Sequence, residues 1–274
     1  MSTSQRGIKN MDKVNKILAF DLTGPMAHFR KYFTNSSSLS YEFPPRTTVI
    51  GIVAGILGLE RDSYYEDFGM RKCRIAVKIK EPTRSIQRTV NYLNTSKSQA
   101  ELKGFGGLNG SAGHTQIPLE IVLPKDINKD KLCYRIYFWH ENEDIMTELY
   151  TRFINRAFVY PVSLGLSEFL GNIENVYLCK EIEAKTSQDF VNVSTVCNLN
   201  TIEHRGLDVS TDEVLRQYIK EIAPVYFTAD RENMQPGEFV YERNGKDIRA
   251  KLKSYYFSVQ DKDVLENIVF MEDK

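Results

Sequence analysis

The order of strand-like and helix-like patterns along the chain is the feature that most constrains its fold. Four segments with alternating apolar residues predict strands, at 16–22, 74–80, 132–139 and 176–182. Apolar residues spaced one helical turn apart predict one helix after Pro44-Pro45 and another over 142–155. The order strand–helix–strand–strand–helix–strand predicts a ferredoxin-like sandwich, with both helices on one face of an antiparallel sheet. We expect the other face to be free for a ligand.

A long polar segment, 82–117, separates the second and third predicted strands. It contains five glycines between positions 104 and 113. A compact domain rarely keeps so long a connection without structure or function. We therefore expect a β-hairpin that protrudes like a thumb, with a glycine-rich tip.

The pattern changes after about residue 186. A capping box formed by Ser210 and Glu213 predicts a short helix that runs on to Ile222. Short strands are predicted after it, at 226–227, 239–241, 255–259 and 264–270. The prediction is an α+β chain with a flexible tail (1–13), a ferredoxin-like, RNA-recognition-motif-like domain (14–185) and a small, mostly-β C-terminal subdomain (186–274).

The charge is balanced overall but unevenly distributed. The chain has 36 basic and 36 acidic side chains, yet residues 16–117 carry 14 basic and 8 acidic ones. Residues 118–274 carry 19 basic and 27 acidic ones. A polyanion would therefore meet the first half, and the second half would face proteins. The alternative is that the basic side chains form an ordinary solvated surface.

The sequence contains no motif for a cofactor or a metal. The four cysteines lie far apart without a C-x-x-C pair, and neither a phosphate-binding loop nor a dinucleotide fingerprint is present. The first residues are polar, and the longest apolar run, 49–59, is too short to span a bilayer. We expect a cytoplasmic protein without cofactor, metal or membrane contact.

Several segments could bind RNA. A helix start offers free backbone N–H groups to an anion, and basic and amide side chains can hold phosphates and base edges. The loop before the first helix and the two flanks of the glycine-rich segment supply such side chains. The candidate RNA contacts are His28, Arg30, Lys31, Arg46, Thr47, Arg84, Arg88, Asn91, Asn94, Lys97, Lys103, Phe105, His114 and Gln116.

Two other functions remain open at this level. Tyr32 and Lys31, with His28 or His114, could cleave RNA without a metal by activating a 2′-hydroxyl group, although their spacing does not define a triad. Such a protein would be a metal-independent endoribonuclease that processes precursor RNA. A ferredoxin-like protein-interaction module without affinity for RNA is the third possibility.

Several segments in order along the chain resemble the fifth family of CRISPR-associated (Cas) proteins, and most closely its type I-B members. They are 24–30 (GPMAHFR), 44–47 (PPRT), 51–61 (GIVAGILGLER), 91–95 (NYLNT), 115–118 (TQIP) and 160–169 (YPVSLGLSEF). Together they span most of residues 16–180. The C-terminal third contributes little to the resemblance.

The resemblance implies a non-catalytic subunit of Cascade, the crRNA-guided surveillance complex of antiviral defence. Such a subunit caps the backbone filament and holds the 5′ handle of the crRNA. It contacts a backbone subunit of the seventh Cas family and a large subunit of the eighth, and it meets target DNA only indirectly. The type I-C branch instead cleaves precursor crRNA, but this chain does not clearly show that branch's pattern. Leu166 also stands where other branches have a basic residue.

Overall fold

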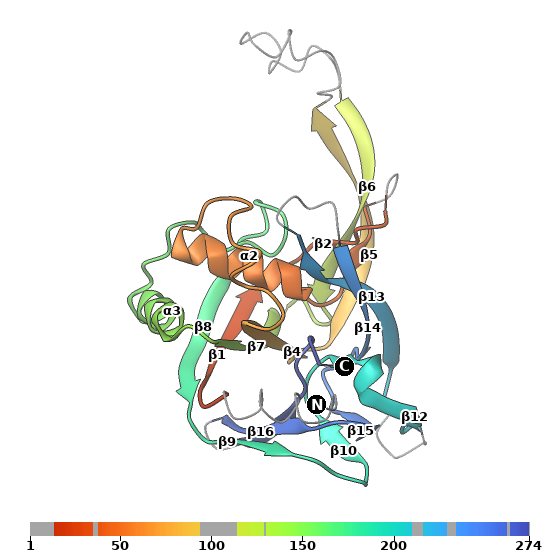
Figure 1. Ribbon diagram of the computed structural model, residues 1–274. Helices are drawn as coiled ribbons and strands as arrows, with labels where there is room; N and C mark the ends of the chain where they lie inside the picture. Colours follow the sequence, from red (N-terminus) through yellow and green to blue (C-terminus); the bar gives the residue numbers. More distant parts are fainter. Residues whose placement is uncertain are drawn as a thin grey trace.

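A four-stranded antiparallel sheet forms the centre of the molecule (Figure 1). The computed structural model describes residues 14–34, 38–93, 114–128, 130–209, 216–228, 234–261 and 264–273. The sheet has the strand order β4-β7-β1-β8. Its strands are β1 (Ile17–Gly24), β4 (Cys73–Ile79), β7 (Leu132–His140) and β8 (Asn172–Cys179).

Two helices cover one face of this sheet. Helix α2 (Arg46–Leu57) begins after Pro45 and ends at Gly58, which has a left-handed φ of 76°. Helix α3 (Glu143–Asn155) begins at Asn142, whose side chain accepts a hydrogen bond from the backbone N–H of Asp144. Both helices bury their apolar stripes against β1, β4 and β7 in one cluster. The predicted α+β character is confirmed at this level.

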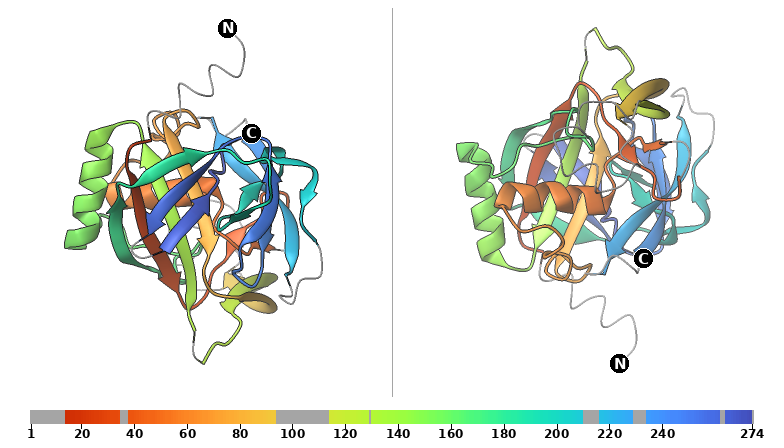
Figure 2. Two further views of the ribbon diagram at one scale, coloured as in Figure 1. Left: turned by 90° about the horizontal axis from the view of Figure 1, so that it is seen from below. Right: turned by 90° about the horizontal axis from the view of Figure 1, so that it is seen from above.

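The opposite face of the sheet is also covered. Strands β9 (Ile182–Lys185), β16 (Tyr256–Asp261) and β17 (Val264–Ile268) form a second sheet. Figure 2 shows the blue C-terminal strands on the face opposite α2. The residues buried there include Ala19, Ala76, Tyr137, Trp139, Phe257, Val259, Ile268 and Phe270.

Our expectation of a free sheet face was therefore wrong. Strand β7 carries apolar residues on both of its faces around Tyr137 and Trp139, which are 0% and 4% exposed. Such a strand needs a cover on each side, because an exposed apolar face of this size is costly in water.

Segments from the C-terminal third also close the edge of strand β4. The backbone N–H of Val196 donates to the carbonyl of Val77 at 2.7 Å, and that of Met271 donates to Ile75 at 2.9 Å. These bonds satisfy backbone groups that an edge strand would otherwise expose. The predicted boundary at residue 186 stays a prediction, but residues on both sides of it share hydrophobic clusters.

Two small sheets complete the C-terminal third. One contains β10 (Val191–Val193), β15 (Ile248–Leu252) and β12 (Ile202–Leu207). The other contains β11 (Cys197–Asn198), β14 (Met234–Glu242) and β13 (Tyr218–Phe227), and the short 3₁₀ helix η3 (Leu199–Thr201) lies between β11 and β12.

The predicted helix ending at Ile222 is wrong over residues 218–222. Those residues belong to β13, because they pair with β14 from Tyr218 opposite Glu242 onward. Pairing with a distant strand outweighs the local helix signal here. Residues 210–215, which include the capping box, lie outside the described residues.

A two-stranded hairpin extends away from the body (Figure 1). It consists of β5 (Thr83–Leu93) and β6 (His114–Pro124), paired in register along their lengths. A small ladder of β2 (Phe29–Arg30) and β3 (Ser40–Tyr41) lies near its base. The predicted glycine-rich tip (residues 94–113) and the predicted tail (1–13) lie outside the described residues.

Candidate nucleic-acid interface

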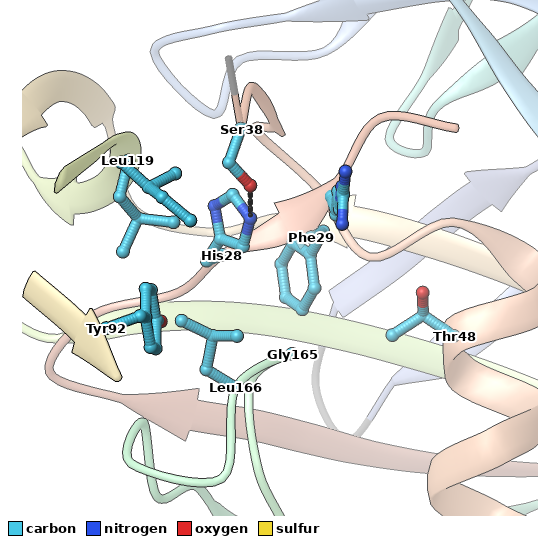
Figure 3. Close-up of a pocket in the computed structure, with 10 residues that line it drawn as sticks. His28, Phe29, Ser38, Thr48, Tyr92, Leu119, Gly165 and Leu166 are labelled. Atoms are coloured by element: carbon cyan, nitrogen blue, oxygen red, sulfur yellow. Dashed lines mark hydrogen bonds between the residues drawn. The ribbon is translucent and has the colours of Figure 1, made fainter. Parts of the chain in front are cut away.

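A cavity of about 500 Å³ lies between the hairpin and the body (Figure 3). It is lined by the segment around β2 and β3, both hairpin strands, the first turn of α2 and the loop before β8. The lining residues are His28, Phe29, Arg30, Ser38, Thr48, Tyr92, Ile117, Leu119, Gly165 and Leu166.

Backbone hydrogen bonds place the hairpin beside this cavity. Ala27 and Val122 exchange two of them, each 2.9 Å long. The N–H of Ser38 donates to Pro118, and the N–H of Glu120 donates to Ser38. Strand β6 is thus bonded on one side to β5 and on the other to the segment around β2 and β3. The cavity wall is an extension of ordered strand pairing.

A close backbone approach at Gly165 forms another wall. Gly165 has a φ of +100°, and a Cβ atom there would lie 1.9 Å from the carbonyl oxygen of His28. The neighbouring Leu164 accepts a hydrogen bond from the backbone N–H of His28 at 2.9 Å. Only glycine fits this position.

His28 is a buried structural residue of the wall, with 2% of its surface exposed. Its Nδ1 lies 2.7 Å from the carbonyl oxygen of Glu120 and its Nε2 lies 2.8 Å from Oγ of Ser38. Because a carbonyl only accepts, Nδ1 carries the proton and Nε2 accepts from the Ser38 hydroxyl. Burial lowers the pKa of His28 below its ordinary 6.5, so the ring is neutral. Both nitrogens are occupied, which corrects the prediction of a direct RNA contact.

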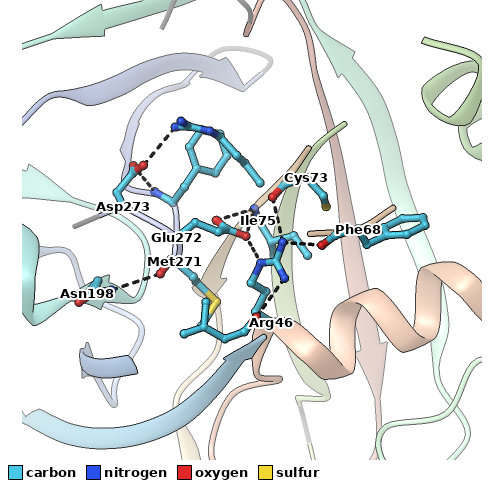
Figure 4. Close-up of polar contacts among 11 residues, drawn as sticks. Arg46, Phe68, Cys73, Ile75, Asn198, Met271, Glu272 and Asp273 are labelled. Atoms are coloured by element: carbon cyan, nitrogen blue, oxygen red, sulfur yellow. Dashed lines mark hydrogen bonds and ion pairs between the residues drawn. The ribbon is translucent and has the colours of Figure 1, made fainter. Parts of the chain in front are cut away.

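Arg46 is likewise corrected. It is fully buried, and its Nε forms an ion pair with Glu272 (Figure 4). Its two terminal nitrogens donate to the carbonyls of Val225, Phe68 and Cys73 at 2.8–3.0 Å. The guanidinium therefore joins α2 to the C-terminal third and cannot reach a ligand in this structure. Thr47 beside it is half-buried at the helix start.

The last residue of β2, Arg30, is an exposed cation, and the next residue, Lys31, is a compensated one. Nζ of Lys31 lies 2.6 Å from a carboxylate oxygen of Glu221 and 5.5 Å from the centre of the Tyr41 ring. Arg30 is exposed and donates to the carbonyl of Thr34 at 3.1 Å. Next to them, the exposed Tyr32 and Phe33 rings meet edge to face with centroids 5.3 Å apart.

The strand register divides the predicted hairpin contacts between two faces. Arg84 and Arg88 are exposed, and by alternation they share a face with Tyr92, which lines the cavity. Asn91 pairs with Gln116, and these two lie on the other face together with His114. Asn94, Lys97, Lys103 and Phe105 lie outside the described residues.

Sequence reasoning missed several lining residues. Tyr92 is 37% exposed, and its alternation with Arg88 could have placed it on the cavity side. Thr48 follows directly after the predicted anion site at the start of α2. Ser38 and Leu119 carried no such signal, because contacts between distant segments bring them to the cavity.

A second hollow of about 360 Å³ adjoins the first and shares Thr48 and Gly165 with it. It runs along α2 past Gly51 and Gly55 to Tyr160, and none of its lining residues is charged. Among the described residues that line the two hollows, Arg30 is the one lysine or arginine.

The described part of the chain lacks two features. It contains no group of three or more His, Cys, Asp or Glu residues arranged to hold a metal ion. It also contains no helix that combines the length and apolar character needed to cross a membrane.

One protein-family model matches part of the chain. The family model described as "CRISPR-associated protein (Cas_Cas5)" matches residues 17–116. A search of curated protein sequences finds no match.

Solved structures give more distant similarities. One from a "CRISPR RNA-guided surveillance complex" is 12% identical, covers 85% of this chain and 91% of its own, and has a TM-score of 0.41. A "Cas protein" crystal structure is 10% identical, with coverages of 84% and 95% and a TM-score of 0.42. A chain of a "Type III-B Cmr-beta bound to cognate target RNA" is 16% identical, with coverages of 65% and 66% and a TM-score of 0.35. Residues 17–116 are thus similar to CRISPR-associated proteins of the Cas5 family.

Proposed function

We propose that this chain is a non-catalytic, crRNA-binding subunit of a type I CRISPR surveillance complex. The 5′ handle of the crRNA would lie in the groove between the hairpin and the body. The observation that carries the proposal is the 500 Å³ cavity, which combines an exposed arginine with an aromatic residue and apolar walls.

The exposed side chains at this groove have complementary tasks in RNA binding. Arg30, Arg84 and Arg88 would hold phosphates, because guanidinium groups form paired hydrogen bonds with phosphate oxygens. Tyr92, with the exposed Tyr32–Phe33 pair, would stack against bases. Leu119 and Leu166 exclude water from the same wall and strengthen the polar contacts around it.

The topology supports a ferredoxin-like assignment with a thumb-like hairpin. The elements β1, α2, β4, β7, α3 and β8 follow the order β-α-β-β-α-β, and the hairpin lies between β4 and β7. The resemblance to type I-B proteins adds the partners: a backbone subunit of the seventh Cas family and a large subunit of the eighth.

The environment of His28 supports a binding role over catalysis. A general base needs a free nitrogen within reach of the substrate hydroxyl, but Glu120 and Ser38 occupy both nitrogens of this ring. The endoribonuclease alternative then depends on His114, which lies on the hairpin face away from Tyr92.

Charge reversal at the groove tests the proposal. Arg30→Glu, Arg84→Glu and Arg88→Glu should each weaken binding to labelled repeat RNA. Each should also reduce the slope of log affinity against log salt by about 0.7, the value for one phosphate contact on a single strand. Lys253→Glu is the matched control, because Lys253 is exposed next to β15 at the end of the molecule away from the hairpin (Figure 1).

Three outcomes would overturn the proposal. If the groove variants behave like the control, RNA does not bind there. Cleavage of the repeat RNA in EDTA that His114→Ala abolishes would establish the endoribonuclease instead. A nucleic-acid-free preparation that fails to bind repeat RNA would favour a protein-interaction module.

A further inference from the structure

A polar cluster around the carboxylate of Glu42 holds the root of the hairpin. The Glu42 side chain is 10% exposed, and it lies 2.5 Å from a terminal nitrogen of Arg243. The hydroxyls of Thr83 and Ser85 donate to its two oxygens at 3.3 and 3.4 Å. The cluster therefore joins the first residues of β5 to a residue just beyond β14.

The chain around Arg243 also supports this root through its backbone. The carbonyl of Arg243 accepts a hydrogen bond from the N–H of Thr83 at 3.3 Å. Two residues later, Gly245 has a φ of +75°, and a Cβ atom there would lie 2.9 Å from the carbonyl of Ile79. The turn after β14 thus packs against the segment that leads from β4 into the hairpin.

Glu242 fixes the shape of that turn. Its side chain is buried, and its Oε2 accepts hydrogen bonds from the backbone N–H groups of Asn244 and Lys246, both at 2.8 Å. The turn is therefore a preorganised support, and Arg243 projects from it toward Glu42.

The two hairpin strands are held by different parts of the chain. Strand β6 is bonded to the segment around β2 and β3 through Val122, Glu120 and Pro118. Strand β5 is held at its start by Glu42 and Arg243. Removing the side-chain attachment leaves β5 held at its start by backbone bonds such as the one from Thr83 to Arg243.

We infer that the Arg243–Glu42 pair is a positioning device, through which the C-terminal third sets the angle of the hairpin and hence the width of the RNA groove. The consequence for RNA rests on the proposed function. Tyr92 lies seven residues beyond Ser85, which corresponds to about 23 Å of strand. A rotation of about 5° at the root would move Tyr92 by about 2 Å, enough to separate a stacked base from its ring.

Loss of the Arg243 guanidinium should disturb the whole cluster. Without Arg243, the carboxylate of Glu42 loses its charge partner in a site that is mostly closed to water. Water must then enter to solvate the carboxylate, and this change loosens the bonds from Thr83 and Ser85. Lysine can restore the positive charge, although not the guanidinium geometry.

The hairpin angle can be measured directly on the protein without RNA. Spin labels at Thr89→Cys on β5 and Thr147→Cys on α3 report the distance between hairpin and body, in a background in which the half-buried Cys133 is serine. Both label sites are exposed. We expect a narrow distance distribution in this background, a broadened or shifted one with Arg243→Met, and recovery toward the original with Arg243→Lys.

Lys220→Met serves as the matched control. It removes an exposed ion pair, 3.0 Å long, between Lys220 on β13 and Glu238 on β14, and neither residue bonds to Glu42 or Arg243 in the cluster. The control should leave the distance distribution unchanged. An unchanged distribution in Arg243→Met would overturn the inference.

Measuring RNA affinity on the same variants tests the inference separately from the proposed function. Arg243→Met should weaken binding to repeat RNA about tenfold, equivalent to 1.4 kcal/mol. The salt dependence should stay as in the parent, because no phosphate contact is lost. A changed distribution with unchanged affinity would overturn the link to the groove. If the parent protein does not bind RNA, the proposed function fails, while the distance measurement still decides whether Arg243 positions the hairpin.

Discussion

Loss of the carboxylate at Glu272 should destabilise the whole protein, because the charge of Arg46 would then lie unpaired in the interior. Arg46 has 0% and Glu272 3% of its side chain exposed. The same carboxylate also accepts from the backbone N–H of Ile75 at 3.1 and 3.2 Å. Breaking a buried ion pair by removing one partner costs about 3–5 kcal/mol. At about 2–4 °C per kcal/mol for a chain of this size, Glu272→Gln should lower Tm by roughly 6–20 °C.

The assay is thermal and urea denaturation followed by circular dichroism, with Lys220→Gln as a control. The control breaks an exposed ion pair and should change stability by less than about 1 kcal/mol. Combining Arg46→Met with Glu272→Met should recover part of the loss, because no lone charge stays buried. The carbonyls that Arg46 now satisfies would still lack a donor. A Glu272→Gln protein that melts within about 2 °C of the parent would refute the reasoning.

The remaining predictions concern pH and two glycines. Burial lowers the pKa of His28 and of His140 below 6.5. As the pH falls, these histidines bind protons in the unfolded chain before they do in the folded protein, so the urea midpoint should fall below about pH 6.5. A flat midpoint between pH 7.5 and 5.5 in an Asp273→Asn background would contradict this. Burial raises the pKa of Asp273 from 3.8 to about 7 even though Arg74 opposes the shift. The folded protein therefore keeps a proton on Asp273 that the unfolded chain loses, and the free energy of unfolding falls as pH rises from about 4 to 7. Asp273→Asn should remove this fall in stability between about pH 4 and 7, and a pH profile equal to that of the parent would contradict the assignment to Asp273. Gly165→Ala should reduce both stability and RNA binding, since its Cβ would meet the carbonyl of His28. Gly55→Ala, whose Cβ would approach nothing closer than 3.9 Å, should stabilise α2 by up to about 1 kcal/mol, and equal melting shifts in the two variants would refute the steric argument.

Local periodicity was sufficient to predict the central elements. Alternation of apolar residues predicted β1, β4, β7 and β8, and one-turn spacing predicted α2 and α3, within a few residues of their ends. These patterns depend only on which side chains share a face. The hairpin strands followed from the polar segment flanking the glycines.

Long-range contacts explain what the sequence could not reveal. Arg46 looked like an anion ligand because its own neighbourhood supplies no partner, whereas Glu272 lies 226 residues further along. His28 looked available because Ser38 and Glu120 come from other segments. Tyr218–Ile222 has a helical spacing of apolar residues, but pairing with β14 decides its conformation. The covered sheet face could have been predicted from Tyr137 and Trp139, which make β7 apolar on both sides.

The edge of β4 is closed by segments that are synthesised much later than β4 itself. At a translation rate of about 5–20 residues per second, Glu272 leaves the ribosome about 11–45 s after Arg46. Until Val196 and then Met271 have been synthesised, the edge of β4 at Val77 and Ile75 lacks the bonds that close it. An open strand edge favours pairing with other chains. Synthesis of this protein therefore includes a period in which the edge of β4 is open to pairing, and that period ends when the C-terminal third docks.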